Sequence, residues 1–364
     1  MRIGLLIYDA LDTVSGGYLY DRQLVSYLAS QGDQVEVVSI PMRNYSQHLL
    51  DNLSRPLYNR LVDLPVDILL QDELNHPSLF YLNRRMKDSI NYTIISIVHH
   101  LRSSESHSGW QKSVYSAVEK NYLESVDGFI FNSQNTRQAV QDLTGSGKNW
   151  VVAYPAGDQL KPDITPGMIE ARAHQAGPLK ILFLGNVIPR KGLHILLEAL
   201  GKITDKDWKL SVVGSMEFDS VYTRGIMQIV SDYEIGEKVR FHGPLGDEQL
   251  IETMRNNQVL AVPSFHEGFG IAYLEGMGFG LPAIGTTSGG AAEIIADNVD
   301  GYLVPRGDAA LLAECITRFI DNRQLLATMS RQARGRYLQH PTWDVNMQLV
   351  RGFLEENINK GGVV

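Results

Sequence analysis

The feature that most constrains this chain is a repeated strand–loop–helix pattern that begins at its first residues. The segment RIGLLIY (2–8) is an apolar run of the buried-strand type, and a loop with two adjacent glycines follows it. Residues 20–34 then carry apolar side chains at helical spacing, and Gly32 stands where a helix C-cap is expected. The next apolar run, VEVVSI (35–40), completes a βαβ unit, which predicts a parallel sheet with a right-handed crossover.

The same pattern starts a second time at LKILFLGN. We therefore predict an α/β fold with two Rossmann-like doubly wound domains, spanning 1–160 and 179–340. The polar, proline-containing segment 161–178 is predicted to be the linker, and 341–364 a helix that packs back on the first domain. Because ligands of such sheets bind at the carboxyl ends of the strands, the cleft between the two domains is the predicted site.

Length and composition exclude several other classes of protein. A chain of 364 residues is long for one core, and a net charge of −8 argues against a nucleic-acid partner. The single cysteine, Cys315, permits no disulfide framework, and Asp9 ends the first apolar run too early for a signal peptide. We expect a cytoplasmic protein. The basic segment RRMK (84–87) is a candidate for peripheral contact with an anionic membrane, although a solvated face is the simpler interpretation.

Two loops of the predicted sheets have the character of anion-binding sites. Gly16 and Gly17 lie between the first strand and the first helix, where backbone N–H groups can approach an oxyanion, although a tight turn would use the same residues. Arg190 and Lys191 lie between a strand and the helix that starts near Gly192. Two cations beside a helix N-terminus suit a diphosphate, and the alternative is a solvated basic turn.

Polar side chains follow two further strands. His99 and His100 close an apolar strand, and an imidazole there can act as a general acid or base or bind a ligand hydroxyl, although such histidines are often structural. Glu267 follows another strand, and Glu275 lies about two turns into the next helix. Carboxylates accept hydrogen bonds from vicinal hydroxyls, as on a ribose or a hexose, whereas either acid alone could be an ordinary surface group.

These motifs together resemble the GT-B glycosyltransferases of family 4, a retaining group. The second half matches the family's nucleotide-sugar domain through LGNVIPRKG, VRFHGPL, VPSFHEGFGIAYLEGMGFGLPAIGTTSGGAAEII and DGYLVPRGD, and Glu267 and Glu275 fit its E-x7-E motif. The first half matches more loosely through SGGYLYDRQLVSYLASQGDQVEVVSI, VHH and FIFNSQNTRQAV. The resemblance spans about residues 1–340 and implies a GT-B fold with an interdomain cleft.

The resemblance also implies a role for each matching residue. Arg190 and Lys191 would bind the donor diphosphate and stabilise the leaving group in place of a metal ion. Glu267 would lie beside the donor sugar and Glu275 would hold the ribose, while the loop from Gly243 to Leu245 would face the base. The implied donor-binding set is Gly16, Gly17, Arg190, Lys191, Gly243, Leu245, Glu267, Gly268, Phe269, Gly270, Ile271 and Glu275. No metal and no cofactor beyond the nucleotide-sugar donor is implied.

The family histidine that touches the donor sugar matches His99. His100 stands where an acidic residue often follows, which leaves the choice between the two open, and the position after SIV favours His99. With His99, Glu267, Arg190 and Lys191 as catalytic residues, the expected reaction is metal-independent transfer of a hexose from a nucleotide-diphosphate sugar with retention of configuration. The departing diphosphate itself would take the acceptor proton, and the protein would supply positioning and charge stabilisation.

Other functions and the acceptor remain open at this point. An NAD-linked two-domain dehydrogenase would need a GxGxxG loop that the sequence does not supply, and a GT-B phosphorylase would need a pyridoxal lysine site. A non-catalytic sugar-binding GT-B protein would keep the fold and lose Glu267, Arg190 or Lys191, and all three are present. The acceptor, a sugar, a polysaccharide or a lipid-linked molecule, would bind the first domain, with Glu105 and His107 as polar candidates.

Overall fold

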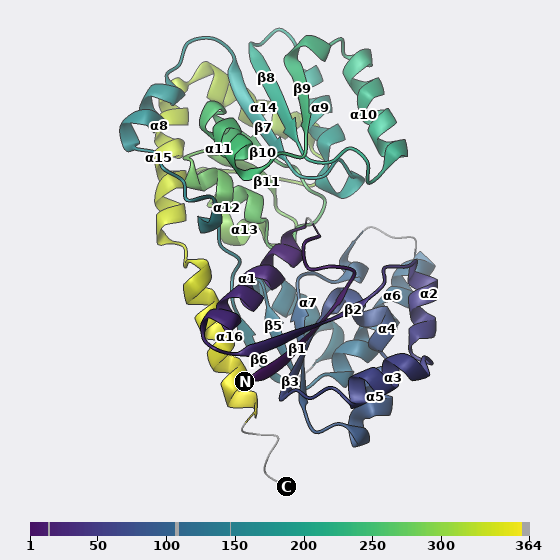
Figure 1. Cartoon of the computed structure of the whole chain (residues 1–364). Helices are drawn as coiled ribbons and strands as arrows, with labels where there is room; N and C mark the ends of the chain where they lie inside the picture. Colours follow the sequence, from purple (N-terminus) through teal and green to yellow (C-terminus); the bar gives the residue numbers. More distant parts are fainter. Residues whose placement is uncertain (14, 106–108, 146, 359–364) are drawn as a thin grey trace. The chain divides into compact units, whose positions relative to one another are not determined.

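The computed structural model describes residues 1–13, 15–105, 109–145 and 147–358, so the candidate His107 lies outside the described residues. The chain divides into two compact units. The N-terminal unit comprises Met1–Pro155 and Trp343–Val364, and the C-terminal unit comprises Ala156–Thr342. Each unit has one sheet flanked by helices (Figure 1).

The sheet of the N-terminal unit has six parallel strands in the order β2-β1-β3-β4-β5-β6. They are β1 (Arg2–Tyr8), β2 (Gln34–Ile40), β3 (Ile68–Asp72), β4 (Thr93–Val98), β5 (Gly128–Phe131) and β6 (Asn149–Val152). The central strands β1, β3 and β4 are buried almost throughout, as their continuous apolar runs predict. The strand order reverses between β1 and β3, which places the switch point of this sheet at the loops that follow these two strands.

Helices connect these strands, and the last helix of the chain joins them. The helical elements are α1 (Gly16–Ser30), α2 (Tyr45–Asp51), α3 (Arg55–Val62), η1 (Glu73–Asn75), α4 (His76–Leu79), α5 (Leu82–Met86), η2 (Lys87–Ser89), η3 (Arg102–Ser104), α6 (Gly109–Ser125), α7 (Gln134–Thr144) and α16 (Trp343–Ile358). Helix α16 packs on α1 and β6. At this contact the ring of Trp343 meets the ring of Tyr20 edge to face, with centroids 5.7 Å apart.

The sheet of the C-terminal unit has the order β12-β11-β10-β7-β8-β9, again with parallel pairing. Its strands are β7 (Leu179–Leu184), β8 (Trp208–Val213), β9 (Val239–Gly243), β10 (Val259–Ala261), β11 (Ala283–Thr286) and β12 (Gly301–Val304). Here the order reverses between β7 and β10, which pair directly through Ile181 and Val259. The loops after β7 and β10 therefore lie together at the switch point, where ligands of such sheets bind.

The helical elements of the C-terminal unit surround this sheet. They are η4 (Asp158–Leu160), α8 (Pro166–Ala173), η5 (Pro189–Lys191), α9 (Leu193–Gly201), α10 (Ser220–Asp232), η6 (Gly236–Lys238), α11 (Asp247–Asn256), α12 (Ile271–Gly278), α13 (Ala291–Ile294), α14 (Ala309–Asp321) and α15 (Arg323–Gln339). Helices α9 and α14 pack together, while α15 packs on α8 and α12.

The structure corrects the predicted linker. Within 161–178, residues 166–173 form helix α8, which packs on α15 and buries Ile169 and Ala173. Thr165 caps this helix by accepting a hydrogen bond from the Met168 N–H, and Pro166 occupies its first turn. Proline is favoured at that position because its missing N–H would have no helical partner there, so the residue that suggested a linker begins a helix.

The described residues contain no helix that is both long and apolar enough to cross a membrane. The basic segment 84–87 has contacts of its own within the N-terminal unit. Arg84 pairs with Glu124 at 3.3 Å, while Arg85 donates to the Asn52 carbonyl at 2.6 Å and lies over the ring of Tyr58. Two of its cations are thus already engaged by neighbouring groups.

Candidate functional site

The loops after β7 and β10 interlock at the switch point of the C-terminal sheet. The Phe265 N–H donates to the Arg190 carbonyl at 2.7 Å, and the Arg190 guanidinium donates back to the His266 carbonyl at 3.0 Å. Between η5 and α9, Gly192 has φ = +72°, and a Cβ there would meet the Pro263 carbonyl oxygen at 2.1 Å. Only glycine allows the two loops to approach this closely.

These loops bring Arg190 and Lys191 against Glu267. Lys191 Nζ donates to Glu267 Oε1 at 2.6 Å, and Arg190 lies 3.8 Å from Oε2 of the same carboxylate. The hydroxyl of Ser264 also donates to Oε1, at 2.6 Å. The Glu267 side chain is 9% exposed, whereas those of Lys191 and Arg190 are 17% and 31% exposed. Two cations therefore pair with one buried acid, and both cationic side chains remain partly exposed, so an anion can reach them.

The two cations decide the charge state of Glu267. Burial raises the pKa of this carboxyl, but the attraction of Lys191 and Arg190 and the hydrogen bonds from Lys191 and Ser264 outweigh it and lower the pKa to about 2. Glu267 is therefore an anion near neutral pH. With two cations and one anion, the corner formed by Arg190, Lys191 and Glu267 carries a net positive charge, which suits a phosphate or diphosphate ligand.

The backbone of Glu267 is held by the loop after β11. The Gly290 N–H donates to the Glu267 carbonyl at 2.8 Å, and Glu267 forms a parallel bridge with Gly289. Gly289 has φ = +82°, and a Cβ there would lie 2.1 Å from the Glu267 carbonyl oxygen. The loop after β11 thus fixes the backbone position from which the Glu267 side chain extends.

Gly289→Ala is therefore expected to lower both stability and activity. The added methyl group must push the Glu267 backbone away, in addition to the strain of a left-handed alanine, which costs roughly 1–2 kcal/mol. Gly307→Ala is the matched control, since Gly307 has φ = +80° and no atom within 4 Å of its Cβ position. Urea unfolding should show Gly289→Ala at least ~2 kcal/mol less stable than Gly307→Ala. Equal losses would mean that the close contact at Gly289 does not constrain Glu267.

Glu275 lies inside helix α12 in a different environment. Its side chain is buried, and Gln159 Nε2 of η4 donates to its Oε1 at 2.6 Å. Burial raises the pKa of Glu275 to about 7, because the hydrogen bond from Gln159 offsets only part of the cost of desolvation. The backbone of Gly157 packs so closely here that a Cβ would meet the Glu275 nitrogen at 3.1 Å. Glu275 is thus a buried acid without a cation within ion-pair distance among the described residues.

Replacing Glu275 with glutamine is expected to stabilise the protein above pH 7. The carboxyl ionises near pH 4.5 when unfolded and near 7 when folded, so the wild type loses stability as the pH rises through this window. Glutamine removes that loss, which is about 1–3 kcal/mol, and its amide oxygen can still accept from Gln159. Thermal melts at pH 5 and pH 8 measure the gain, which should appear only at pH 8. Glu252→Gln, at an exposed position in α11, should change neither melt.

The other predicted donor residues of the C-terminal unit lie on nearby loop ends. Gly270 precedes the first turn of α12 with φ = +101°, a conformation that favours glycine, and Phe269 is buried. Gly243 ends β9 with φ = +69°, and Leu245 is half-buried. Gly268 and Ile271 complete the segment between Glu267 and α12, so its backbone amides lead directly from the acid to a helix N-terminus.

The predicted residues of the N-terminal unit gather at the switch point of its own sheet. Ser15 caps α1 by accepting from the Tyr18 N–H, so Gly16 and Gly17 form the first turn of this helix. A Cβ at Gly17 would lie 3.1 Å from Cδ2 of His99, the residue that follows β4. The structure thus places Gly17 against His99.

The two adjacent histidines have different partners. His99 Nε2 lies 3.6 Å from Oδ1 of Asp21, a fully buried residue of α1, and the His99 side chain is 13% exposed. His100 Nε2 lies 3.2 Å from Oε1 of Glu105, and both of these side chains are more exposed. His99 and His100 therefore face different groups, and only His99 contacts the glycine loop of α1 in this way.

Two groups in the N-terminal unit have ligand atoms within 4.8 Å of one another, as a metal site requires. They are Asp21 with Asp72 and His99, and Glu73 with His76 and Glu119. A protonated His99 between the two aspartates produces the same spacing in the first group, whereas in the second group burial lowers the pKa of His76 to about 4, so the protons there lie on the glutamates. Burial raises the pKa of Asp72 to about 6 and that of Glu73 to about 8, so protons are available to these clusters near neutral pH.

The sequence pattern did not indicate several of the residues that surround the predicted ones. Ser264 belongs to the matched motif VPSFHEGFG, in which it was given no role of its own. Gln159 was assigned to the first domain, and Asp21 and Asp72 look like ordinary polar residues at the edges of apolar runs. Asp72 could have been recognised, because it is the last residue of a buried strand and so lies at the carboxyl edge of the sheet.

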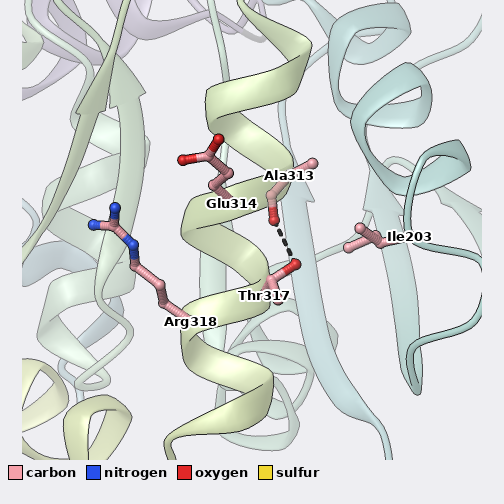
Figure 2. Close-up of a pocket in the computed structure, with 5 residues that line it drawn as sticks. All are labelled: Ile203, Ala313, Glu314, Thr317 and Arg318. Atoms are coloured by element: carbon pink, nitrogen blue, oxygen red, sulfur yellow. Dashed lines mark hydrogen bonds between the residues drawn. The ribbon is translucent and has the colours of Figure 1, made fainter.

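A surface hollow of the C-terminal unit lies away from all predicted site residues. Figure 2 shows its lining, which comes mainly from helix α14, where Ala313 and Thr317 lie on the side of Ile203 and Thr317 donates to the Ala313 carbonyl at 2.8 Å. Arg318 and Glu314 point outward from the same helix, and Ile203 faces it from the turn after α9. This lining contains no residue of the loops after β7 and β10, so the hollow plays no part in the predicted site.

Comparison with known proteins supports both the fold and the motif assignment. Residues 168–336 match the family described as glycosyl transferases group 1. A D-inositol 3-phosphate glycosyltransferase of Streptomyces griseus is 32% identical over 52% of this chain and 43% of that protein. A phosphatidyl-myo-inositol mannosyltransferase of Mycobacterium leprae is 25% identical over 93% of both chains. The chain spans about half the length of the curated inositol-phosphate relatives it matches.

Solved structures share the fold at lower sequence identity. A sucrose-phosphate synthase from Thermosynechococcus elongatus aligns with a TM-score of 0.83 at 21% identity, over 99% of this chain and 100% of that one. Anabaena HepE, solved with UDP and glucose, aligns with a TM-score of 0.78 at 21% identity, over 98% and 99% of the two chains. These likenesses confirm the predicted GT-B fold with two Rossmann-like units.

Proposed function

We propose that this protein, whose residues 168–336 match the family of group 1 glycosyl transferases, transfers a hexose from a nucleotide-diphosphate sugar to an acceptor with retention of configuration and without a metal ion. The observation that carries this proposal is the placement of Arg190 and Lys191 around Glu267 at the switch point between β7 and β10. This corner combines a net positive charge with a carboxylate that stays ionised, which are the groups that a diphosphate and a sugar hydroxyl require.

Arg190 and Lys191 stabilise the charge that develops on the departing nucleoside diphosphate. Positioned cations are effective here because their energy is gained where negative charge grows during the reaction. Glu267 accepts a hydrogen bond from the donor sugar, with the backbone amides of Gly268, Phe269, Gly270 and Ile271 next to it on the approach to α12. The leaving diphosphate takes the proton of the acceptor hydroxyl, so the new bond forms on the face from which the diphosphate departs.

The remaining donor contacts extend this arrangement. Glu275 holds the ribose hydroxyls, and the loop from Gly243 to Leu245 faces the base. From the N-terminal unit, Gly16 and Gly17 approach the phosphates through backbone amides, and His99 contacts the donor sugar. The acceptor binds the N-terminal unit. A nucleotide-linked glucose is a reasonable first donor, since HepE was solved with UDP and glucose and the inositol-phosphate relatives are named glycosyltransferases.

A donor panel tests this proposal. The purified protein is incubated with UDP-, GDP- and ADP-linked sugars in the presence of EDTA, and thermal shift and donor hydrolysis are measured. One class of donor is expected to raise the melting temperature and to be hydrolysed slowly, and NMR of the released or transferred sugar is expected to show the anomeric configuration of the donor. Binding that requires an added divalent ion, or an inverted product, would contradict the proposed mechanism.

A further inference from the structure

We propose that Asp21 is a positioning residue that holds the His99 imidazole as a cation and fixes its orientation toward the donor. This inference rests on the proposed function, in which His99 acts on the donor sugar, and it adds a residue that the motif resemblance does not include. It follows from the burial of Asp21, from the packing around His99 and from the charges that face this imidazole.

Asp21 is a carboxylate with an unusual environment. The residue is fully buried in the first helix, α1, and neither of its carboxylate oxygens has a hydrogen-bond partner among the described residues. A buried carboxylate is costly unless an opposite charge lies nearby. The cationic group found against Asp21 is His99, whose Nε2 lies 3.6 Å from Oδ1. The negative charge of the Asp21 carboxylate is therefore compensated within this pair only when the His99 imidazole is protonated.

An acidic group from another element reinforces this charge. Asp72 at the end of β3 also faces His99, whereas Glu73 of η1, with its pKa raised to about 8, is largely neutral near pH 7; His100 acts on both acids from the neighbouring position in the chain. Burial alone would lower the pKa of His99, but Asp21, followed by Asp72, raises it above its ordinary value. The imidazolium form is therefore more favoured at His99 than at an ordinary histidine.

The packing around His99 fixes where this cation lies. Its backbone carbonyl accepts from Asn132 Nδ2 at 2.9 Å and from Thr136 Oγ1 at 3.3 Å. Gly17 packs against Cδ2, and the ring of Tyr20 meets the imidazole edge to face, with centroids 5.3 Å apart. With Nε2 turned toward Asp21, Nδ1 is the ring nitrogen left to donate a hydrogen bond, and no described residue occupies it.

The Asp21→Asn variant of the full chain tests this inference. Asparagine keeps the shape of the side chain and removes its charge, and the carboxylate it replaces has no hydrogen bond to lose. The imidazole pKa of His99 is followed by NMR titration of histidine-labelled protein, with the signal assigned by its loss in His99→Gln. We expect the pKa of His99 to fall by about one unit or more, and the alkaline limb of the kcat profile to move to lower pH with it. At pH 6 the variant should regain much of the turnover that it lacks at pH 8, with little change in donor KM.

A matched control uses another buried carboxylate of the same unit. Asp51 lies 3.1 Å from His48 and away from the cluster around His99, so Asp51→Asn should leave the His99 titration and the pH profile in place. An unchanged His99 titration in Asp21→Asn would overturn the inference. A lowered His99 pKa with an unchanged pH profile would support the role of Asp21 and instead contradict the proposed action of His99 on the donor. If Asp21→Asn does not fold, Asp21→Ser is titrated in its place, and an unchanged His99 pKa in that variant would likewise overturn the inference.

Discussion

Replacing Lys191 with alanine is expected to lower kcat by about 10²–10³-fold, the effect of removing one group that stabilises developing negative charge in an enzyme site. Lys191 lies 2.6 Å from Glu267 and keeps 17% of its side chain exposed, so its ammonium group is oriented by the acid and still open to a ligand. The loss should appear in kcat more than in acceptor KM, because the charge on the departing diphosphate grows only as the bond to the sugar breaks. Steady-state transfer or donor hydrolysis measures it.

Lys206→Ala is the control for this measurement. Lys206 belongs to the same unit and also pairs with a carboxylate, Asp321 at 2.9 Å, but it lies in an exposed turn remote from the loops after β7 and β10. Its removal should leave kcat unchanged within twofold. If Lys191→Ala and Lys206→Ala behaved alike, Lys191 would be an ordinary surface ion-pair residue.

Glu267→Gln is the second variant with a large expected effect. Glutamine has nearly the same shape but no charge, so it loses the anion that orients Lys191 and Arg190 and accepts the sugar hydroxyl. We expect kcat/KM for the donor to fall by about 10²-fold or more. Glu170→Gln is the control, because Glu170 also pairs with an arginine, Arg331, and contacts the imidazole of His174 at an exposed position of the same unit.

The same variant has a defined dependence of stability on pH. The pKa of Glu267 is about 2 in the folded protein, against 4.5 for an unperturbed group, so its carboxylate stabilises the folded state above pH 4.5. This contribution amounts to about 3 kcal/mol at most and is lost as the pH falls from 4.5 toward 2. Glu267→Gln should therefore melt below the wild type at pH 7, and the two melting temperatures should converge near pH 2–3. A constant difference at all pH values would show that the loss comes from packing rather than from charge.

Much of the fold could be predicted from the sequence because its strands are continuous apolar runs. RIGLLIY and LKILFL are buried as strands β1 and β7, and each begins a parallel, doubly wound sheet. The order of the strands within each sheet was harder to predict from the sequence. That β7 pairs with β10 follows from tertiary packing, and this pairing is what brings Lys191 and Glu267 together across 76 residues of chain. Their presence at strand ends was predictable, whereas their direct contact was not.

The misses also have physical causes. Residues 161–178 looked like a linker because their prolines suggested a break, yet Pro166 occupies the first turn of helix α8. Gln159 was placed in the other domain, and only the folded chain shows it bound to Glu275. Asp21 occupies one position of an amphipathic helix, where a carboxylate normally faces solvent. In the folded chain its carboxylate lies beside His99, which is 78 positions later in the sequence, and no local sequence pattern indicates such a distant partner.

The central claim is that the corner of Arg190, Lys191 and Glu267 binds the donor diphosphate without a metal ion. Calorimetric titration with the nucleoside diphosphate selected by the donor panel, in EDTA, tests it most directly when the wild type, Lys191→Ala and Lys206→Ala are compared. We expect the wild type and Lys206→Ala to bind alike and Lys191→Ala to bind at least tenfold more weakly, while affinity for the parent nucleoside stays the same in all three. Equal affinity of Lys191→Ala and wild type for the diphosphate would contradict the claim.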